Sequence, residues 1–268
     1  MIMLFPIFGT LVYIIMFITL IFGKTFRNII TEQKKAAPYY KQDETVIQEI
    51  QKENADYVSQ LAFLHQEGFP FYRNTDFSFY SPCEEGFERM IKELKKAEKY
   101  IFMEYFIIEE GIMWNSILSI LEEKVKQGVE VRVMYDDMGS LNTLPASYTR
   151  QLEKKGIKAV SFNRISPVIN TIMNHRDHRK ILVIDGKVAF SGGANLADEY
   201  INEKVIHGHW MDNIICVKGN AVWSYLVTFL TNFFAPEATL MMKTTGVHIS
   251  GMVTDGFFGQ NPICILIG

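Results

Sequence analysis

The sequence predicts an α/β protein in which a layered sheet lies between helices and an apolar helix precedes the folded body. Three observations support this fold class. Helical and strand-like hydrophobic patterns alternate between residues 84 and 162. A two-residue turn signal, Asp185-Gly186, separates two apolar segments with β-strand character. Residues 2–23 contain no charged side chain.

The N-terminal segment has the properties of a membrane anchor. Leu, Ile, Phe, Val and Met dominate residues 4–22, a run long enough to cross a bilayer as a helix. No basic region precedes this run and no small-residue cleavage pattern ends it, which argues against a signal peptide. We therefore expect a transmembrane anchor at residues 1–23 and a basic juxtamembrane linker at residues 24–56. Cations that would lie beside anionic lipids follow the anchor: Lys24, Arg27, Lys34, Lys35 and Lys41.

By the positive-inside rule these cations place the rest of the chain in the cytoplasm.

Within the expected catalytic body, residues 57–243, helical and strand patterns alternate. Residues 100–108 are expected to form a buried strand that contains one carboxylate, Glu104. The remaining expected helices are 84–99, 113–127, 144–155, 196–200 and 219–234, and the remaining expected strands are 129–135, 157–162 and 209–217, besides the hairpin.

The candidate chemistry lies in residues 175–195, around the expected hairpin. His178 and Lys180 are two residues apart, so on a strand their side chains project from the same face. With Asp185 and Gly186 as a two-residue loop, the register pairs Ile184 with Lys187, Lys180 with Ser191 and His178 with Gly193.

This arrangement suggests a phosphate site. Lys180 supplies positive charge, and Asn195, diagonally across from His178, supplies an amide donor. Gly193 and its neighbouring glycine allow close approach of the backbone, and neutral His178 can attack phosphorus. The alternative for Asp185 is a role as turn residue alone, and the alternative for the glycine pair is a bulge.

Further polar residues could complete the site. Trp210 and Asp212, with a histidine beside them, suggest a wall of the pocket. Glu104 and Asp136 at strand ends either line the pocket or are buried hydrogen-bonding residues of the sheet, and the second alternative is favoured.

Composition narrows the possible partners. A hydrophobic content of 48% is sufficient for a core, and a net charge of −3 argues against a general nucleic-acid binder. The three cysteines share no CxxC spacing, which fits a reducing compartment. No cofactor is indicated, and no metal site is expected, because no cysteine or carboxylate is spaced to complete a zinc site with the histidines.

His178, Lys180 and Asp185, followed by Gly-Gly-x-Asn at 192–195, resemble the HxKxxxxD signature of the phospholipase D superfamily. Within it, residues 103–108, 131–140, 174–195 and 208–212 are most similar to bacterial cardiolipin synthases. The resemblance implies a layered α-β-α sandwich at the cell membrane. It also implies transfer of a phosphatidyl group from one phosphatidylglycerol to another through a phosphohistidine, which makes cardiolipin and releases glycerol.

The resemblance also implies roles for single residues. His178 would be the catalytic histidine, Lys180 and Asn195 phosphate ligands, and Asp185 the supporting aspartate of the motif. Asp212 would orient His178 by accepting its Nδ1 proton, or would be a salt-bridged strand residue. Substrate-binding positions are expected at Asn195, Gly193, Ser191, Glu104 and Trp210.

The sequence departs from the family in one respect. Cardiolipin synthases resemble two fused halves, each with one HxKxxxxD motif, whereas residues 1–268 contain a single motif and an atypical tail at 244–268. The expected partner is therefore a second half, in the form of a missing C-terminal half or a homodimer mate. Two alternatives stay open, a catalytically silent membrane fragment and a single-motif nuclease or phosphodiesterase that acts as a homodimer.

Overall fold

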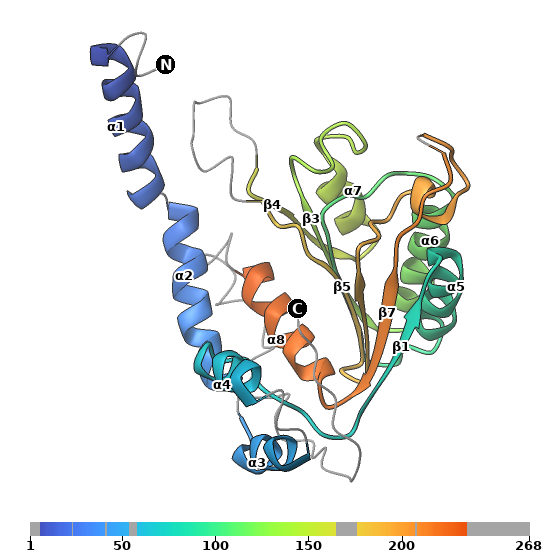
Figure 1. Cartoon of the computed structure of the whole chain (residues 1–268). Coiled ribbons are helices and arrows are strands. Elements are labelled where there is room, and N and C mark those ends of the chain that lie inside the picture. The colour runs from blue at the N-terminus through green and yellow to red at the C-terminus, as the bar shows by residue number, and fades with distance from the viewer. Residues whose placement is uncertain are drawn as a thin grey trace.

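The computed structural model describes residues 6–22, 24–40, 42–53, 58–164, 176–206 and 208–234 (Figure 1). His175 and the tail at 244–268 lie outside them. The described strands form one seven-stranded sheet in the order β1-β7-β6-β5-β2-β3-β4. They are β1 (Thr75–Tyr80), β2 (Tyr100–Tyr105), β3 (Glu130–Asp136), β4 (Lys158–Phe162), β5 (Lys180–Ile184), β6 (Val188–Gly192) and β7 (Ile214–Gly219).

The sheet is mixed because two kinds of connection build it. Strands β2, β3 and β4 are parallel and are joined by helices, whereas β5, β6, β7 and β1 pair antiparallel. As a result, the loops at 106–111, 137–147 and 193–213 all leave the sheet at the end where β5 begins. We call this end the loop end, and it lies uppermost in Figure 1.

Helices cover both faces of the sheet, which confirms the expected α/β class. On one face, α5 (Cys83–Leu94) and α6 (Ile112–Lys126) bury a core with Met103, Leu182 and Phe190. On the other, α8 (Val222–Phe234) packs on Phe102 and Val183. The remaining helices are α1 (Pro6–Phe22), α2 (Lys24–Ala36), η1 (Ala37–Tyr39), α3 (Glu44–Glu53), α4 (Val58–Gln66), α7 (Tyr148–Lys154) and η4 (Asp198–Ile201).

The expected linker at 24–56 is largely helical and is attached to the body. Helix α2 packs on α8. The hydroxyl of Tyr40 lies 2.9 Å from that of Thr228, and the indole of Trp223 donates to the carbonyl of Tyr39 at 2.8 Å. Among the described residues, no helix combines the length and apolar character needed to cross a membrane.

The hairpin forms at the expected turn, but its register differs from the expected one by one residue. Asp185 and Gly186 have φ of 53° and 64°, and the N–H of Lys187 donates to the carbonyl of Ile184 at 3.0 Å. Ile184 nevertheless pairs with Val188, not with Lys187. Lys187 is therefore an extra residue in the ladder, and its carbonyl accepts from Gly219 on the other side.

This one-residue shift corrects the predicted position of Ser191. Side chains alternate between the faces of a strand, so the shift moves Ser191 to the opposite face from Lys180. Ser191 pairs with Ile215, which packs on the α8 side, whereas Phe190 belongs to the core under α5 and α6.

Asp185 holds the turn against the start of β2. Its carboxylate accepts from the backbone N–H groups of Glu98 at 2.9 Å, Lys99 at 2.7 Å and Tyr100 at 2.9 Å. Asp185→Ala should lower the free energy of unfolding by about 2–4 kcal/mol, because three charge-assisted hydrogen bonds are lost. Asp185→Asn, which keeps one acceptor and tolerates positive φ, should cost about half as much. Urea denaturation measures both, with the exposed turn residue Lys187→Ala as the control. Equal midpoints for Asp185→Ala and Lys187→Ala would contradict this role.

Candidate active site

His178 and Lys180 lie together at the loop end of the sheet. Nδ1 of His178 is 3.2 Å from Nζ of Lys180, and the same ammonium donates to the His178 carbonyl at 2.8 Å. The His178 ring is exposed and rests on Phe106, with ring centroids 4.6 Å apart. This geometry confirms that the two motif residues share a face.

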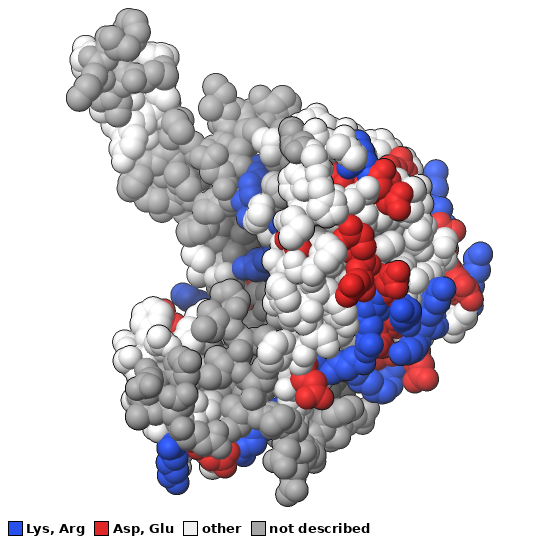
Figure 2. All heavy atoms as spheres, turned by 45° about the vertical axis from the view of Figure 1, so that its right-hand side comes forward, with Lys and Arg blue, Asp and Glu red and all other residues white. Residues whose placement is uncertain are grey.

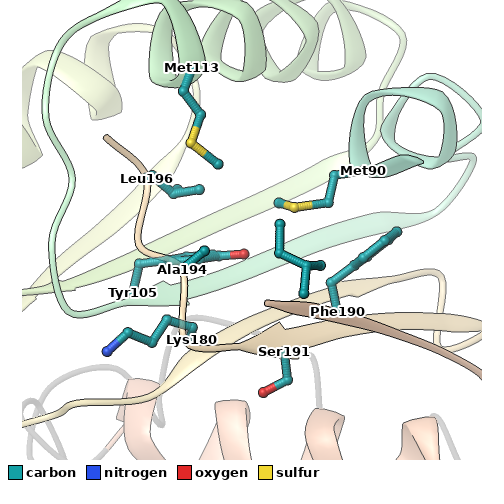
Figure 3. Close-up of a pocket in the computed structure, with 9 residues that line it drawn as sticks. Met90, Tyr105, Met113, Lys180, Phe190, Ser191, Ala194 and Leu196 are labelled. Carbon is teal, nitrogen blue, oxygen red and sulfur yellow. The ribbon is translucent and has the colours of Figure 1, made fainter. Parts of the chain in front are cut away.

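The aliphatic part of the Lys180 side chain is buried in the protein. The residue is only 5% exposed, and its stem lines a small apolar pocket with Met90, Tyr105 and Met113. Figure 3 shows the nitrogen pointing away from the two methionines. Burial lowers the pKa of Lys180, while the nearby carboxylates of Asp212 and Asp177 oppose this change.

Asn195 lies beside the site, but its amide is used by the fold. The side-chain oxygen accepts from the backbone N–H of Ile107 at 3.0 Å, and the nitrogen donates to the hydroxyl of Tyr200 at 2.8 Å. With 3% of its surface exposed, Asn195 ties the end of β6 to the loop that carries Phe106. Its role as a phosphate ligand stays a prediction.

Gly193, Asp212 and Trp210 form a second group near Lys180. A Cβ added at Gly193 would lie 1.9 Å from Oδ1 of Asp212, so a larger residue at 193 would displace this carboxylate. The Trp210 indole lies 3.5 Å from Oδ2 of Asp212. Asp212 acts on Lys180 electrostatically, but no hydrogen bond between it and His178 is described. Nδ1 of His178 faces Lys180 instead of the expected carboxylate.

Glu104 belongs to the opposite face of the sheet. It is 1% exposed, accepts from Asn232 of α8 at 2.8 Å and lies 3.8 Å from a guanidinium nitrogen of Arg179. The same guanidinium group is 3.3 Å from Asp177. Burial, followed by repulsion from Asp177, raises the pKa of Glu104 well above its usual range. Glu104 is thus a buried residue of the sheet, one of the two alternatives considered for it.

Asp185 is the motif residue most distant from the chemistry. It follows the last residue of β5, whereas His178 precedes the first. Seven residues of extended chain separate their backbones by roughly 20 Å. The motif therefore has two parts. His178 and Lys180 form a reactive pair at the loop end, and Asp185 is a structural residue at the other end of β5.

Two residues that hold His178 in place, Asp177 and Phe106, were not predicted, whereas Asp136 is a buried hydrogen-bonding residue, the favoured one of its two alternatives. His178 precedes β5, and the N–H of Asp177 donates to the buried carboxylate of Asp136 at 2.9 Å. Phe106 supports the imidazole from below. The sequence held a signal for each of them. Asp177 directly precedes His178, and Phe106 follows the strand that contains Glu104.

The arrangement can bind and attack an anionic phosphodiester. The amine of Lys180 lies 3.2 Å from Nδ1 of an exposed imidazole, so a positive charge that can bind a phosphate lies beside a nitrogen nucleophile.

Comparison with known proteins indicates the family to which the chain is similar. Residues 90–225 match the family described as "Cardiolipin synthase, PLD-like domain". The chain is 47% identical to an uncharacterized protein of Streptococcus mutans, over 84% of this chain and 49% of that protein. It is 33% identical to cardiolipin synthase 2 of Bacillus cereus, over 93% of this chain and 50% of that protein. The chain thus spans about half the length of the curated relatives it matches.

Among solved structures, the chain is similar to Nuc, a phospholipase D family member from Salmonella typhimurium. The TM-score is 0.45 at 16% identity, over 60% of this chain and 95% of Nuc.

The buried Glu104 gives a testable pH dependence. Its pKa in the folded protein is raised above the ordinary value of 4.5, so the folded state binds this proton more tightly than the unfolded state does. This contribution to stability is complete below about pH 4.5 and is lost as the pH rises through the raised pKa. Glu104→Gln should therefore flatten the decline of the melting temperature above pH 4.5. Parallel melting curves for the two proteins would show that Glu104 is not the titrating group.

Proposed function

Because residues 90–225 match its domain, the chain belongs to the cardiolipin synthase, phospholipase D-like domain family, and we propose that it supplies one catalytic half of a membrane phosphatidyltransferase. The supporting observation is the His178–Lys180 pair, with 3.2 Å between the imidazole and the ammonium at the open end of the sheet. Phosphatidylglycerol is the proposed donor and acceptor, and cardiolipin and glycerol are the proposed products.

The first step forms a phosphohistidine. A ring nitrogen of His178 attacks the phosphorus of phosphatidylglycerol, and an N–P bond forms as the bond to the head-group glycerol oxygen breaks. Lys180 stabilises the charge on the phosphate oxygens. The departing glycerol oxygen takes a proton from a histidine of a second half.

The second step returns the enzyme to its starting state. A hydroxyl of a second phosphatidylglycerol attacks phosphorus and gives its proton to the same second histidine. The N–P bond then breaks, and cardiolipin leaves. Water in place of this hydroxyl would give hydrolysis.

The Lys180–His178 contact has a role in this scheme. In the free protein the ammonium occupies Nδ1, so the two groups restrain each other. A bound phosphate competes for the ammonium and frees the imidazole, which links activation of His178 to the presence of substrate. Asp212 lies close enough to influence Lys180 and, after this rearrangement, could accept the imidazole proton.

We also propose that the protein lies at the cell membrane, with the catalytic body on the cytoplasmic side, because the proposed substrate is a membrane lipid. The uncharged N-terminal run and the cations that follow it support this proposal.

Loss of the nucleophile tests the proposal directly. His178→Ala should abolish labelling of the protein by phosphatidylglycerol that carries a radioactive phosphate, because no other residue replaces the attacking nitrogen. The matched control is His65→Ala, a histidine of α4 beside Glu44. Label that persists in His178→Ala but disappears under acid treatment would place the phosphohistidine elsewhere.

Dependence on a second half is the next test. Residues 1–268 alone, in mixed micelles with phosphatidylglycerol, should release glycerol slowly, because one imidazole cannot attack phosphorus and protonate the leaving oxygen together. Adding the second half of a two-motif synthase should raise the rate by about 10²–10⁴-fold, the range of general acid catalysis. Full activity of a monomer without that half would contradict the two-histidine scheme.

A further inference from the structure

Six large apolar side chains are exposed at the loop end of the sheet, where His178 also lies. They lie in or next to the three loops at the loop end of the sheet, and Val205 and Met211 are 76% and 71% exposed. We call this set the apolar rim: Ile112, Met138, Leu141, Val205, Ile206 and Met211.

Hydrogen bonds between the loops make the rim one structure. The hydroxyl of Thr143 donates to the carbonyl of Ile108 at 2.6 Å, which joins the loops at 137–147 and 106–111. The N–H of Glu109 donates to the carbonyl of Leu196 at 2.9 Å, which joins the latter to the third loop. The apolar side chains are therefore held on a connected framework.

Two members of the rim directly precede residues that adjoin the reactive pair. Met138 precedes Gly139, which packs on Phe106, the residue that contacts the His178 ring. Met211 precedes Asp212, which acts on Lys180. A surface that receives the rim would therefore come close to His178 as well.

We propose that the apolar rim inserts into a lipid surface and sets the depth at which His178 meets the phosphodiester. This inference rests on the proposed function, since a phospholipid carries its phosphodiester just outside the apolar layer. Side chains buried beneath the head groups would bring the exposed imidazole to the phosphate level.

Helix α1 favours a lipid surface over a second protein half as the occupant. It rises beyond the sheet at the loop end in Figure 1, and it exposes Ile7, Phe8 and Leu11 there. The rim and the exposed apolar residues of α1 thus lie at the same end of the molecule.

The opposite end of the sheet has a different surface. Lys92, Lys95, Lys96 and Lys99 lie at the end of α5 or before β2, far from the loop end. In the view of Figure 2, Lys and Arg side chains gather in the lower right part of the molecule. Some of these cations are paired, as with Lys96 and Glu93 at 3.4 Å.

Charge does not drive insertion of the rim. Lys204 is paired with Glu109 at 2.5 Å, while Glu110 and Glu203 expose carboxylates on the same loops. The rim should therefore enter zwitterionic bilayers without any anionic lipid, because apolar burial and not attraction to anionic head groups stabilises it.

The test uses the full chain in vesicles, with an environment-sensitive fluorophore at single cysteines. Val205→Cys and Met211→Cys report on the rim, and Lys95→Cys is the exposed control at the opposite end. Cys83 and Cys216 are buried, and Cys264 is replaced by serine. The vesicles contain phosphatidylcholine alone or with phosphatidylglycerol, each with and without brominated acyl chains.

We expect blue-shifted emission at positions 205 and 211, quenched by brominated chains in both kinds of vesicle, and neither effect at position 95. Blue-shifted but unquenched emission would mean that protein covers the rim, and it would overturn the inference. Unshifted emission at both rim positions, or quenching only at position 95, would also overturn it. Because no turnover is measured, this result stands apart from the activity tests of the proposed function.

Discussion

The site depends on how the residues before β5 are held outside the hydrogen-bond ladder of the sheet. His178 is two residues ahead of the strand, where no neighbouring strand pairs with it. The carboxylate of Asp136 replaces a strand neighbour here, because it accepts a hydrogen bond from the backbone N–H of Asp177 at 2.9 Å. Asp136 also accepts from Met138 and Gly139, so one buried carboxylate sets the path of two site loops. The position of the imidazole is therefore fixed by the end of β3, a distant part of the chain.

Alternation along this segment separates two kinds of chemistry. His178 and Lys180 project toward the loops and the apolar pocket, whereas Asp177 and Arg179 meet Glu104 on the α8 face. The sheet thus keeps the buried carboxyl group of Glu104 apart from the reactive imidazole. Lys180 contacts that imidazole, and the carboxylates of Asp212 and Asp177 lie close enough to act on its charge.

The sequence was sufficient for the layered class, the turn at Asp185 and the shared face of the reactive pair, because hydrophobic period and alternation are local properties. It was not sufficient for the hairpin register, since the extra residue Lys187 is accommodated by pairing with β7 and not by the turn itself. Ser191 was assigned to the wrong face for this reason. The edge strand β1 was not predicted, because its pattern of exposed side chains lacks a buried stripe. The burial of Glu104 depends on α8, more than a hundred residues downstream.

Asp185 sits in the family signature beside the reactive residues, yet it belongs to the framework. Its three backbone hydrogen bonds are independent of what happens at the opposite end of β5. The signature thus combines residues of two kinds: His178 and Lys180 belong to the reactive site, and Asp185 stabilises the fold. A relative that keeps the aspartate and loses the histidine would still fold as this domain does. Such a chain should be counted as a member of the fold and not as an enzyme, and motif searches that score the three positions equally would confuse the two.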